Sequence, residues 1–182
     1  MKKYFLYLII ALISSSFNAQ SKYYTRDGSI DFEASVPSFE EVKTTNNTVS
    51  SILNVTTGEI AVLALVKGFR FKIALMEEHF NESFAESTKF PKATFEGKIE
   101  EFFLENLTTE STVFSLNGKL TFHGKSVYIS LKADISIDKN IIHLTSSFVL
   151  NPDDFNIKIP KIVRKKVAKE VIIRLNFILK PK

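Results

Sequence analysis

The sequence contains no cysteine, and this absence excludes several kinds of protein at once. A chain without thiols has no disulfides, no zinc–thiolate site and no nucleophilic cysteine. Its 182 residues must therefore hold a fold together by packing and hydrogen bonding alone. Tryptophan is also absent, and glycine and proline are scarce, whereas 17 phenylalanines accompany many isoleucines, valines and threonines. Because these residue types favour strands over helices, we expect a mostly β protein.

A hydrophobic run long enough to cross a membrane is also missing. Two N-terminal lysines are followed by an apolar stretch over residues 4–13, which then gives way to serines. A transmembrane helix needs roughly 20 apolar residues, whereas a short apolar run with a basic start and a polar end is typical of a secretory signal peptide. We therefore predict a signal peptide over residues 1–20, a single mature domain over residues 21–182, and a periplasmic or secreted location.

The chain has little net charge, which bears on its partners. It has 24 basic and 20 acidic residues, and removal of Lys2 and Lys3 with the signal peptide leaves 22 basic residues and a net charge of +2. A nucleic-acid-binding protein normally presents a strongly basic face. We expect no nucleic-acid partner.

Apolar and polar residues alternate along much of the mature chain. In the clearest run, every second residue from Val127 to Ile137 is apolar and the residues between them are mainly polar. A strand with one buried face requires this period of two. Similar runs predict further strands over residues 28–35, 49–55, 60–66, 69–73, 93–103, 112–122, 142–150 and 171–179.

Turn-forming pairs such as Asn117–Gly118 and His123–Gly124 punctuate these runs. Short connections between alternating strands imply antiparallel neighbours. Two stretches break the pattern: residues 75–87 predict a short helix, and residues 152–168 predict a loop that includes a helical turn. Strands of this number can close as a barrel or stack as a sandwich, and the pattern alone does not choose between them.

Residues 116–127 (LNGKLTFHGKSV) contain a Gly-x-Leu-Thr-x-x-Gly turn before a long alternating strand, and residues 90–95 (FPKATF) fit a Tyr/Phe-Pro-x-Ala-x-Phe motif. Both segments resemble characteristic stretches of the YceI-like family. Residues 154–157 (DFNI), followed by residues 170–173, resemble its closing Asp-Phe-x-Ile and final strand. The resemblance covers most of the mature chain, in order.

This resemblance implies a lipocalin-like antiparallel β-barrel of about eight strands, with a short helix at one end. It also implies that the tubular interior holds a long apolar chain, typically a polyisoprenoid or a quinone tail, in the periplasm. The expected partner is therefore a long-chain apolar lipid, specifically an isoprenoid. No cofactor is expected.

The inward faces of the predicted strands form the candidate ligand-binding site. Walls of phenylalanine and branched aliphatic residues without convergent polar groups suit an apolar chain. The alternative is a solid hydrophobic core in a structural or partner-binding β-domain. The candidate residues are Phe69, Phe71, Phe95, Phe114, Phe122, Ile129, Leu131, Leu144, Phe148, Ile173, Leu175 and Phe177.

Catalytic and metal-binding sites have little support in the sequence. His79 and Glu82 would share one face of a helix, but His123 beside a turn glycine and His143 on a strand do not converge with them. A zinc site normally needs three or four such ligands. No serine lies in a Gly-x-Ser-x-Gly elbow, and no glycine-rich phosphate loop is present. We expect no enzymatic activity, no catalytic residue and no metal.

Five cations lie between Lys161 and Lys169, interleaved with Ile162, Val163 and Val167. We call residues 161–169 the basic segment. It is either a solvated loop or a rim that contacts the head of the ligand or, transiently, an anionic membrane surface, as amphipathic basic segments do.

The predicted signal peptide can be tested by pulse-labelling. We expect the precursor to be cut near Ser21 and the product to be recovered in the periplasmic fraction, because the apolar run is too short to anchor the chain. The measurement is the N-terminal sequence and fractionation of the labelled chain. Unprocessed protein retained in the membrane would contradict it.

Overall fold

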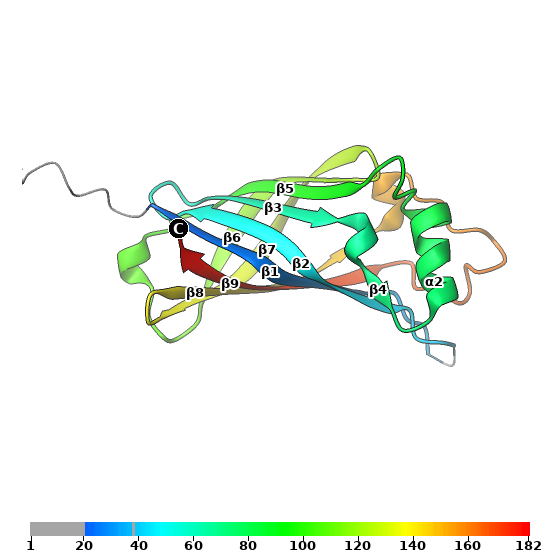
Figure 1. Ribbon diagram of the computed structural model, residues 1–182, viewed down its shortest axis with the longest axis horizontal. Helices are drawn as coiled ribbons and strands as arrows, with labels where there is room; N and C mark the ends of the chain where they lie inside the picture. Colours follow the sequence, from blue (N-terminus) through cyan, green and yellow to red (C-terminus); the bar gives the residue numbers. More distant parts are fainter. Residues whose placement is uncertain (1–20, 38) are drawn as a thin grey trace, which may run out of the picture.

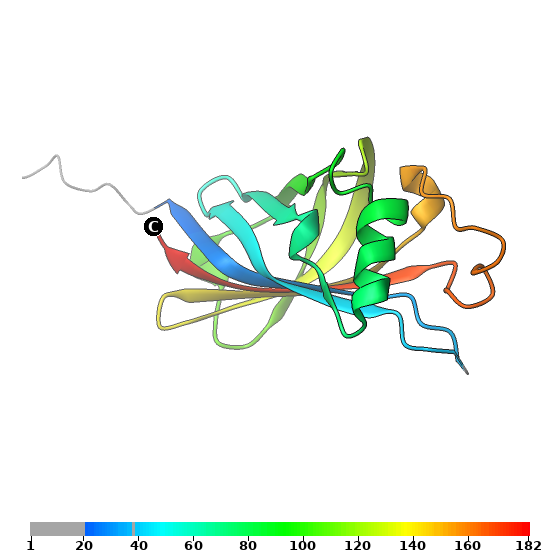
Figure 2. The same cartoon turned by 45° about the vertical axis from the view of Figure 1, so that its right-hand side comes forward.

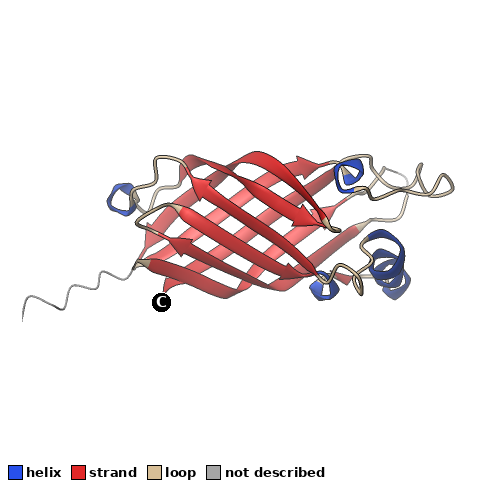
Figure 3. Ribbon diagram, turned by 90° about the horizontal axis from the view of Figure 1, so that it is seen from above, coloured by secondary structure: helices blue, strands red, loops and turns tan. Residues whose placement is uncertain are grey.

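The computed structural model describes residues 21–37 and 39–182, and the predicted signal peptide over residues 1–20 lies outside them. Within the described part of the chain, nine strands form one antiparallel sheet (Figures 1 and 3). Their bounds are β1 Lys22–Glu33, β2 Lys43–Asn54, β3 Glu59–Leu65, β4 Arg70–Phe71, β5 Lys92–Ile99, β6 Thr112–Phe122, β7 Lys125–Asp138, β8 Ile141–Leu150 and β9 Val171–Pro181.

The sheet closes on itself. The strands follow the order β1-β9-β8-β7-β6-β5-β3-β2-β4, and a further antiparallel pairing joins β1 to β2 along most of their length. Because β4 contributes only two residues beside β2, the closed barrel consists of eight strands. The predicted mostly β, lipocalin-like antiparallel barrel is confirmed.

Short helical segments lie at the two ends of the barrel. Helix α2 (Ala74–His79) continues into the π-helical turn η2 (Phe80–Phe84) and crosses one end (Figure 2), which confirms the predicted short helix. The 3₁₀ turn η4 (Pro152–Phe155) lies at the same end, which we call the mouth. The 3₁₀ turn η3 (Leu104–Asn106) lies at the other end, near the C-terminus, which we call the closed end.

The strand predicted over residues 69–73 is wrong except for the two residues of β4. The chain leaves the sheet after β3 in a 3₁₀ turn, η1 (Val66–Gly68), before it returns beside β2. The buried side chain of Asn46, on β2, packs against this turn, and its Nδ2 donates a hydrogen bond to the carbonyl of Leu65 at 3.0 Å. A Cβ at Gly68 would come within 2.5 Å of that nitrogen, so only glycine allows the close approach.

Two further local predictions are corrected. The strand predicted over residues 93–103 ends at Ile99, because Glu101 adopts a left-handed backbone with φ 51° and the chain turns across the closed end. The predicted turn at Asn117–Gly118 lies instead in the middle of β6, where Gly118 is paired with Gly97 of β5. A Cβ on either glycine would come within 2.6 Å of the Phe95 ring, which folds over the pair.

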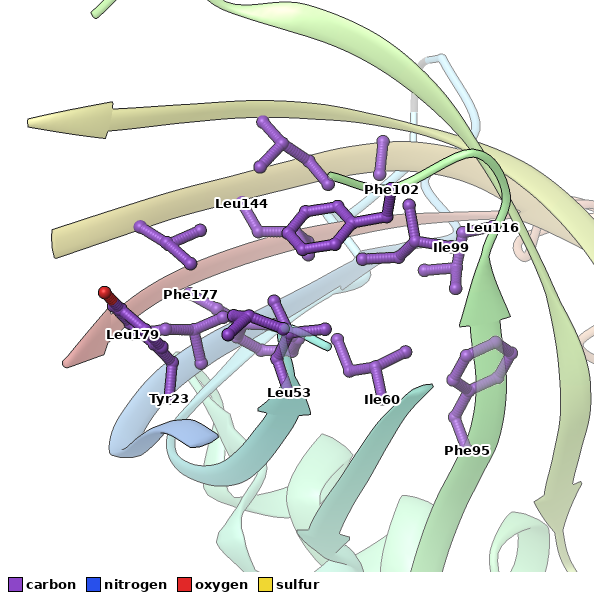
Figure 4. Close-up of a cluster of buried hydrophobic side chains, with 14 of the residues drawn as sticks. Tyr23, Leu53, Ile60, Phe95, Ile99, Phe102, Leu116, Leu144, Phe177 and Leu179 are labelled. Atoms are coloured by element: carbon purple, nitrogen blue, oxygen red, sulfur yellow. The ribbon is translucent and has the colours of Figure 1, made fainter. Parts of the chain in front are cut away.

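Side chains that face inward fill the closed end. Alternating residues of β7, β8 and β9 near this end are fully buried, among them Ile135, Ile142 and Leu179. Phe102, from the turn after β5, packs into the same cluster, which Figure 4 shows. Tyr23 is also buried here, where burial raises the pKa of its phenol, and its hydroxyl donates a hydrogen bond to Oδ1 of Asn140.

Inward-facing residues toward the mouth are only partly buried. On β9, Leu179 and Phe177 are buried, whereas Leu175, Ile173 and Val171, on the same face, are of intermediate exposure. The same change occurs along β7, from Ala133, Ile135 and Leu131 to Ile129 and Val127. The interior is therefore filled at one end and hollow at the other, and neither a solid core nor a continuous tunnel describes the whole barrel.

This division predicts that truncating leucine to alanine lowers the free energy of unfolding by different amounts at two positions of β9. Leu179→Ala should lower the free energy of unfolding by about 2–5 kcal/mol, because it leaves a cavity in a packed cluster. Leu175→Ala should cost clearly less, because its side chain already borders empty space. Urea unfolding of the ligand-free proteins measures both values. Equal losses would contradict the division into a filled and a hollow half.

Candidate functional site

The hollow half of the barrel holds a cavity of about 480 Å³. This volume is within the usual range for small-molecule sites, roughly 300–1,000 Å³. Its floor is formed by buried side chains that include Ile60, Leu116, Leu144 and Phe177, below which the closed-end cluster begins. Its upper lining includes exposed residues, so the cavity is blind at the floor and reaches the surface at the mouth.

Eleven of the twelve residues selected from the sequence line this cavity. They come from strands β4 to β9 and, for Phe69, from the residue between η1 and β4, and their side chains form the wall from floor to mouth. They are Phe69, Phe71, Phe95, Phe122, Ile129, Leu131, Leu144, Phe148, Ile173, Leu175 and Phe177.

Phe114 is the exception. It faces inward on β6, as the alternation predicts, but it lies toward the closed end, where it is paired with Ala133 and its ring centroid is 5.9 Å from that of Phe102. Phe114 is therefore part of the packing beneath the cavity and not of its lining.

Several lining residues were missed in the sequence. Phe32 of β1 and Phe80 of η2 form an aromatic cluster with Phe69 and Phe71, with ring centroids 5.3–5.9 Å apart. Tilted and edge-on pairs at these distances are favourable aromatic contacts. The cluster attaches η2 to the barrel wall. The alternation in β1 could have indicated Phe32, but no periodic signal places a residue of an irregular turn such as Phe80.

The mouth is built from four segments that are not part of the barrel strands. These are the connection from β1 to β2, helix α2 with η2, the turn η4, and the loop between η4 and β9. The last of these includes the basic segment, whose Val163 and Val167 line the cavity. Among the lining residues of the described chain, the polar ones are Thr94 in the wall and, exposed around the mouth, Glu40, His79, Asn151 and Lys166.

This distribution separates an apolar interior from a polar rim. A group that carries charge keeps its hydration at the rim, whereas an apolar chain loses contact with water below it. The cavity is therefore suited to an amphipathic molecule with an apolar body inside and a polar end at the mouth.

His123 links three segments at the mouth: the β6–β7 turn, the turn η4, and the segment between η2 and β5. It lies in the turn between β6 and β7, where its Nδ1 is 3.0 Å from the carbonyl oxygen of Phe155 and its Nε2 is 2.6 Å from Oε2 of Glu86. Its ring also packs edge-on against Phe90, with the ring centroids 4.7 Å apart. Because a carbonyl can only accept, Nδ1 is the donor in the contact with Phe155, and Nε2 lies against the carboxylate of Glu86.

The three histidines of the described chain do not come together. His79 is exposed on α2 beside the cavity, His123 is bound to Glu86, and His143 is exposed on the outer face of β8. In residues 21–37 and 39–182, no group of three histidine or acidic side chains is placed to hold a metal ion. No helix in the same residues is both long and apolar enough to span a bilayer.

Comparison with known families decides the relationship. The family described as the YceI-like domain matches residues 21–179. The chain belongs to the YceI-like family. The three segments that suggested this family surround the cavity of this YceI-like chain: residues 116–127 form the β6–β7 hairpin, residues 90–95 lead into β5, and residues 154–157 place Phe155 and Ile157 at the mouth.

Solved structures share the barrel at low sequence identity. A polyisoprenoid-binding domain from Saccharophagus degradans, described as implicated in plant cell wall breakdown, is 12% identical with a TM-score of 0.77, over 89% of this chain and 99% of that one. Burkholderia cenocepacia BcnA is 15% identical with a TM-score of 0.68, over 83% and 95%. A Campylobacter jejuni YceI protein is 18% identical with a TM-score of 0.58, over 79% and 88%. No match was found among curated proteins.

The contacts of His123 predict a local role at the mouth. His123→Asn keeps a residue type that tolerates the left-handed backbone at this position, φ 50°, but it is too short to reach both partners. We expect a loss of about 1–3 kcal/mol in the free energy of unfolding and faster amide hydrogen exchange in residues 84–90 and 152–157.

The matched control is His143→Asn on the outer face of β8, where no such contacts are present. Hydrogen exchange followed by mass spectrometry measures both variants. Exchange that is unchanged at the mouth, or raised equally at the closed end, would contradict a local role for His123.

Proposed function

We propose that this YceI-like protein binds a long-chain apolar lipid, an isoprenoid such as a polyprenol or a quinone tail, in its barrel. The observation that carries the proposal is the cavity of about 480 Å³, blind at its floor and lined by aromatic and aliphatic side chains. The polyisoprenoid-binding domain with the same fold supports the ligand class. Family membership supports the same assignment.

The tail of the lipid would run along the wall between Phe148 of β8, Ile173 of β9 and Ile129 of β7. Each methylene removed from water contributes about 0.8 kcal/mol by transfer. Ordering of the tail and of the mouth offsets much of this gain. Affinity should therefore depend on tail length, while the head remains at the rim beside His79 and Lys166.

We propose a binding role without a chemical step. General acid–base and nucleophilic catalysis require reactive side chains that converge within hydrogen-bond reach of one reacting atom. In the described chain, the wall below the rim provides the hydroxyl of Thr94 and otherwise apolar side chains. This wall suits sequestration of a lipid better than its conversion.

We also propose that the protein acts after export, in the periplasm or outside the cell. The support is the pattern of residues 1–20, with its basic start and short apolar run. The partners would be the apolar lipid and, transiently, the anionic membrane surface that supplies it.

The ligand proposal is tested with a charge placed in the cavity wall. Leu131→Arg puts a cation where the tail would lie, because Leu131 is 6% exposed and lines the cavity. Lys132→Ala changes the adjacent residue, whose side chain is on the outer face and contacts Ser115. We expect the parent and Lys132→Ala to bind geranylgeraniol and Leu131→Arg to lose at least tenfold in affinity, since a buried charge without a partner is strongly unfavourable.

Native mass spectrometry with geranylgeraniol, and analysis of lipid extracted from the purified protein, provide the measurements. A second variant, Ile129→Trp, fills cavity volume without charge and should also weaken binding if Leu131→Arg does not fold. The proposal fails if the folded parent binds no geranylgeraniol and yields no extracted lipid.

A further inference from the structure

The basic segment concentrates positive charge at one place beside the mouth. Its five cations in residues 161–169 have no acidic residue among them, so the segment carries +5. Because residues 21–182 as a whole carry +2, the remainder of this part of the chain carries −3. A local cluster of cations attracts a negatively charged surface before contact is made.

The same segment is part of the cavity wall. Val163 and Val167, four residues apart, line the cavity from one side of the loop. The amide of Ala168 donates to the carbonyl of Ala34, just after β1, at 2.8 Å, and within the loop the amide of Arg164 donates to the carbonyl of Pro160 at 3.0 Å. The cations therefore lie on a loop that borders the opening and is joined to the end of β1.

Large apolar side chains project into solvent at the same end of the molecule. Ile162 in the basic segment is 86% exposed, Leu75 on α2 is 57% exposed and Phe39 in the β1–β2 connection is 47% exposed. Figures 1 and 2 both show these three segments together at the mouth, beyond the ends of the barrel strands. The three side chains are on separate segments around an opening and do not form one flat face.

We propose that the mouth docks on an anionic lipid bilayer, with Ile162, Leu75 and Phe39 inserted among the headgroups and the cations of the basic segment at the lipid phosphates. Interfacial membrane binding combines buried apolar area with attraction of Lys and Arg to anionic lipids. The inference rests on the proposed function, because docking in this orientation would let an apolar chain pass between bilayer and cavity without crossing water.

Acidic residues at the mouth determine which side approaches first. Glu40 and Glu41 lie on the β1–β2 connection, and Glu78 and Glu82 are exposed on α2 and η2. Asp153 and Asp154 are exposed on η4, and the exposed Glu170 directly follows the basic segment. Glu77 is compensated by Arg70 at 2.5 Å. The attraction is therefore strongest at the basic segment, and the other two segments contribute through their apolar side chains.

Co-flotation with phosphatidylcholine vesicles, with and without phosphatidylglycerol, tests the proposal. The full-length processed protein should associate with the anionic vesicles at low salt. Lys161→Gln with Lys165→Gln should reduce this association by about tenfold at low salt. The difference should vanish at high salt, where the Debye length falls to about 3 Å. Ile162→Ser should reduce association at both salt concentrations, because its contribution is apolar.

Matched controls lie at the closed end. Lys139→Gln with Lys180→Gln removes two exposed cations there, and Phe103→Ser removes an exposed apolar side chain. Neither should change association. The proposal is overturned if the parent does not prefer anionic vesicles or if the closed-end variants lose as much association as the mouth variants. It is also overturned if an acidic protein binds the mouth more strongly than the anionic vesicles do.

Binding of geranylgeraniol delivered from detergent micelles separates this inference from the proposed function. The variants at Lys161, Lys165 and Ile162 should bind it as the parent does, since these side chains lie outside the cavity lining. A parent that binds vesicles but no geranylgeraniol would refute the lipid cavity and leave the docking surface. A parent that binds geranylgeraniol but no anionic vesicles would refute docking alone.

Discussion

The pairing of β1 with β2 is the constraint on which the rest of the structure depends. It joins the two ends of the sheet, so the eight long strands have no free edge along which other chains could pair. A chain without cysteine has no disulfide to hold its first strand beside its second, so the pairing rests on hydrogen bonds and packing. Closure also encloses every inward-facing side chain, and the interior can then be filled or left hollow according to what covers each end.

The two ends are covered differently, and this difference creates the cavity. At the closed end, the segment after β5 turns inward and buries Phe102 and Leu107 against the strands. At the mouth, α2 and η2 lie across the opening and contribute Phe80 and Phe84 to its lining, but the space beneath them remains open. The strands have the same apolar alternation at both ends, so it is the connecting segments that decide where space remains.

This explains how much could be predicted from the sequence. Alternation identifies the face of a strand reliably, because a shift by one residue would expose the whole apolar set. It contains no information on depth along the barrel. Phe114 and Phe122 are eight residues apart on one face of β6, which is about 26 Å at 3.3 Å per residue, and only Phe122 reaches the cavity. The depth of a residue follows from strand register, which pattern alone does not reveal.

Irregular segments were the least predictable part and form most of the mouth. The polar start of β2, residues 43–48, was missed because its buried residues are polar: Thr44 donates a hydrogen bond to the carbonyl of Arg70 in β4, and Asn46 donates one to the carbonyl of Leu65 at the end of β3. Apolar residues of the basic segment lie on opposite sides of the loop. Val163 and Val167 face the cavity and Ile162 faces solvent, although all three are branched aliphatic residues. That division follows from the turns within the loop and from the hydrogen bond between Ala168 and Ala34 that joins the loop to the end of β1. The specificity of a barrel of this kind is therefore determined in its connections, while its strands provide a wall that would accept many apolar chains.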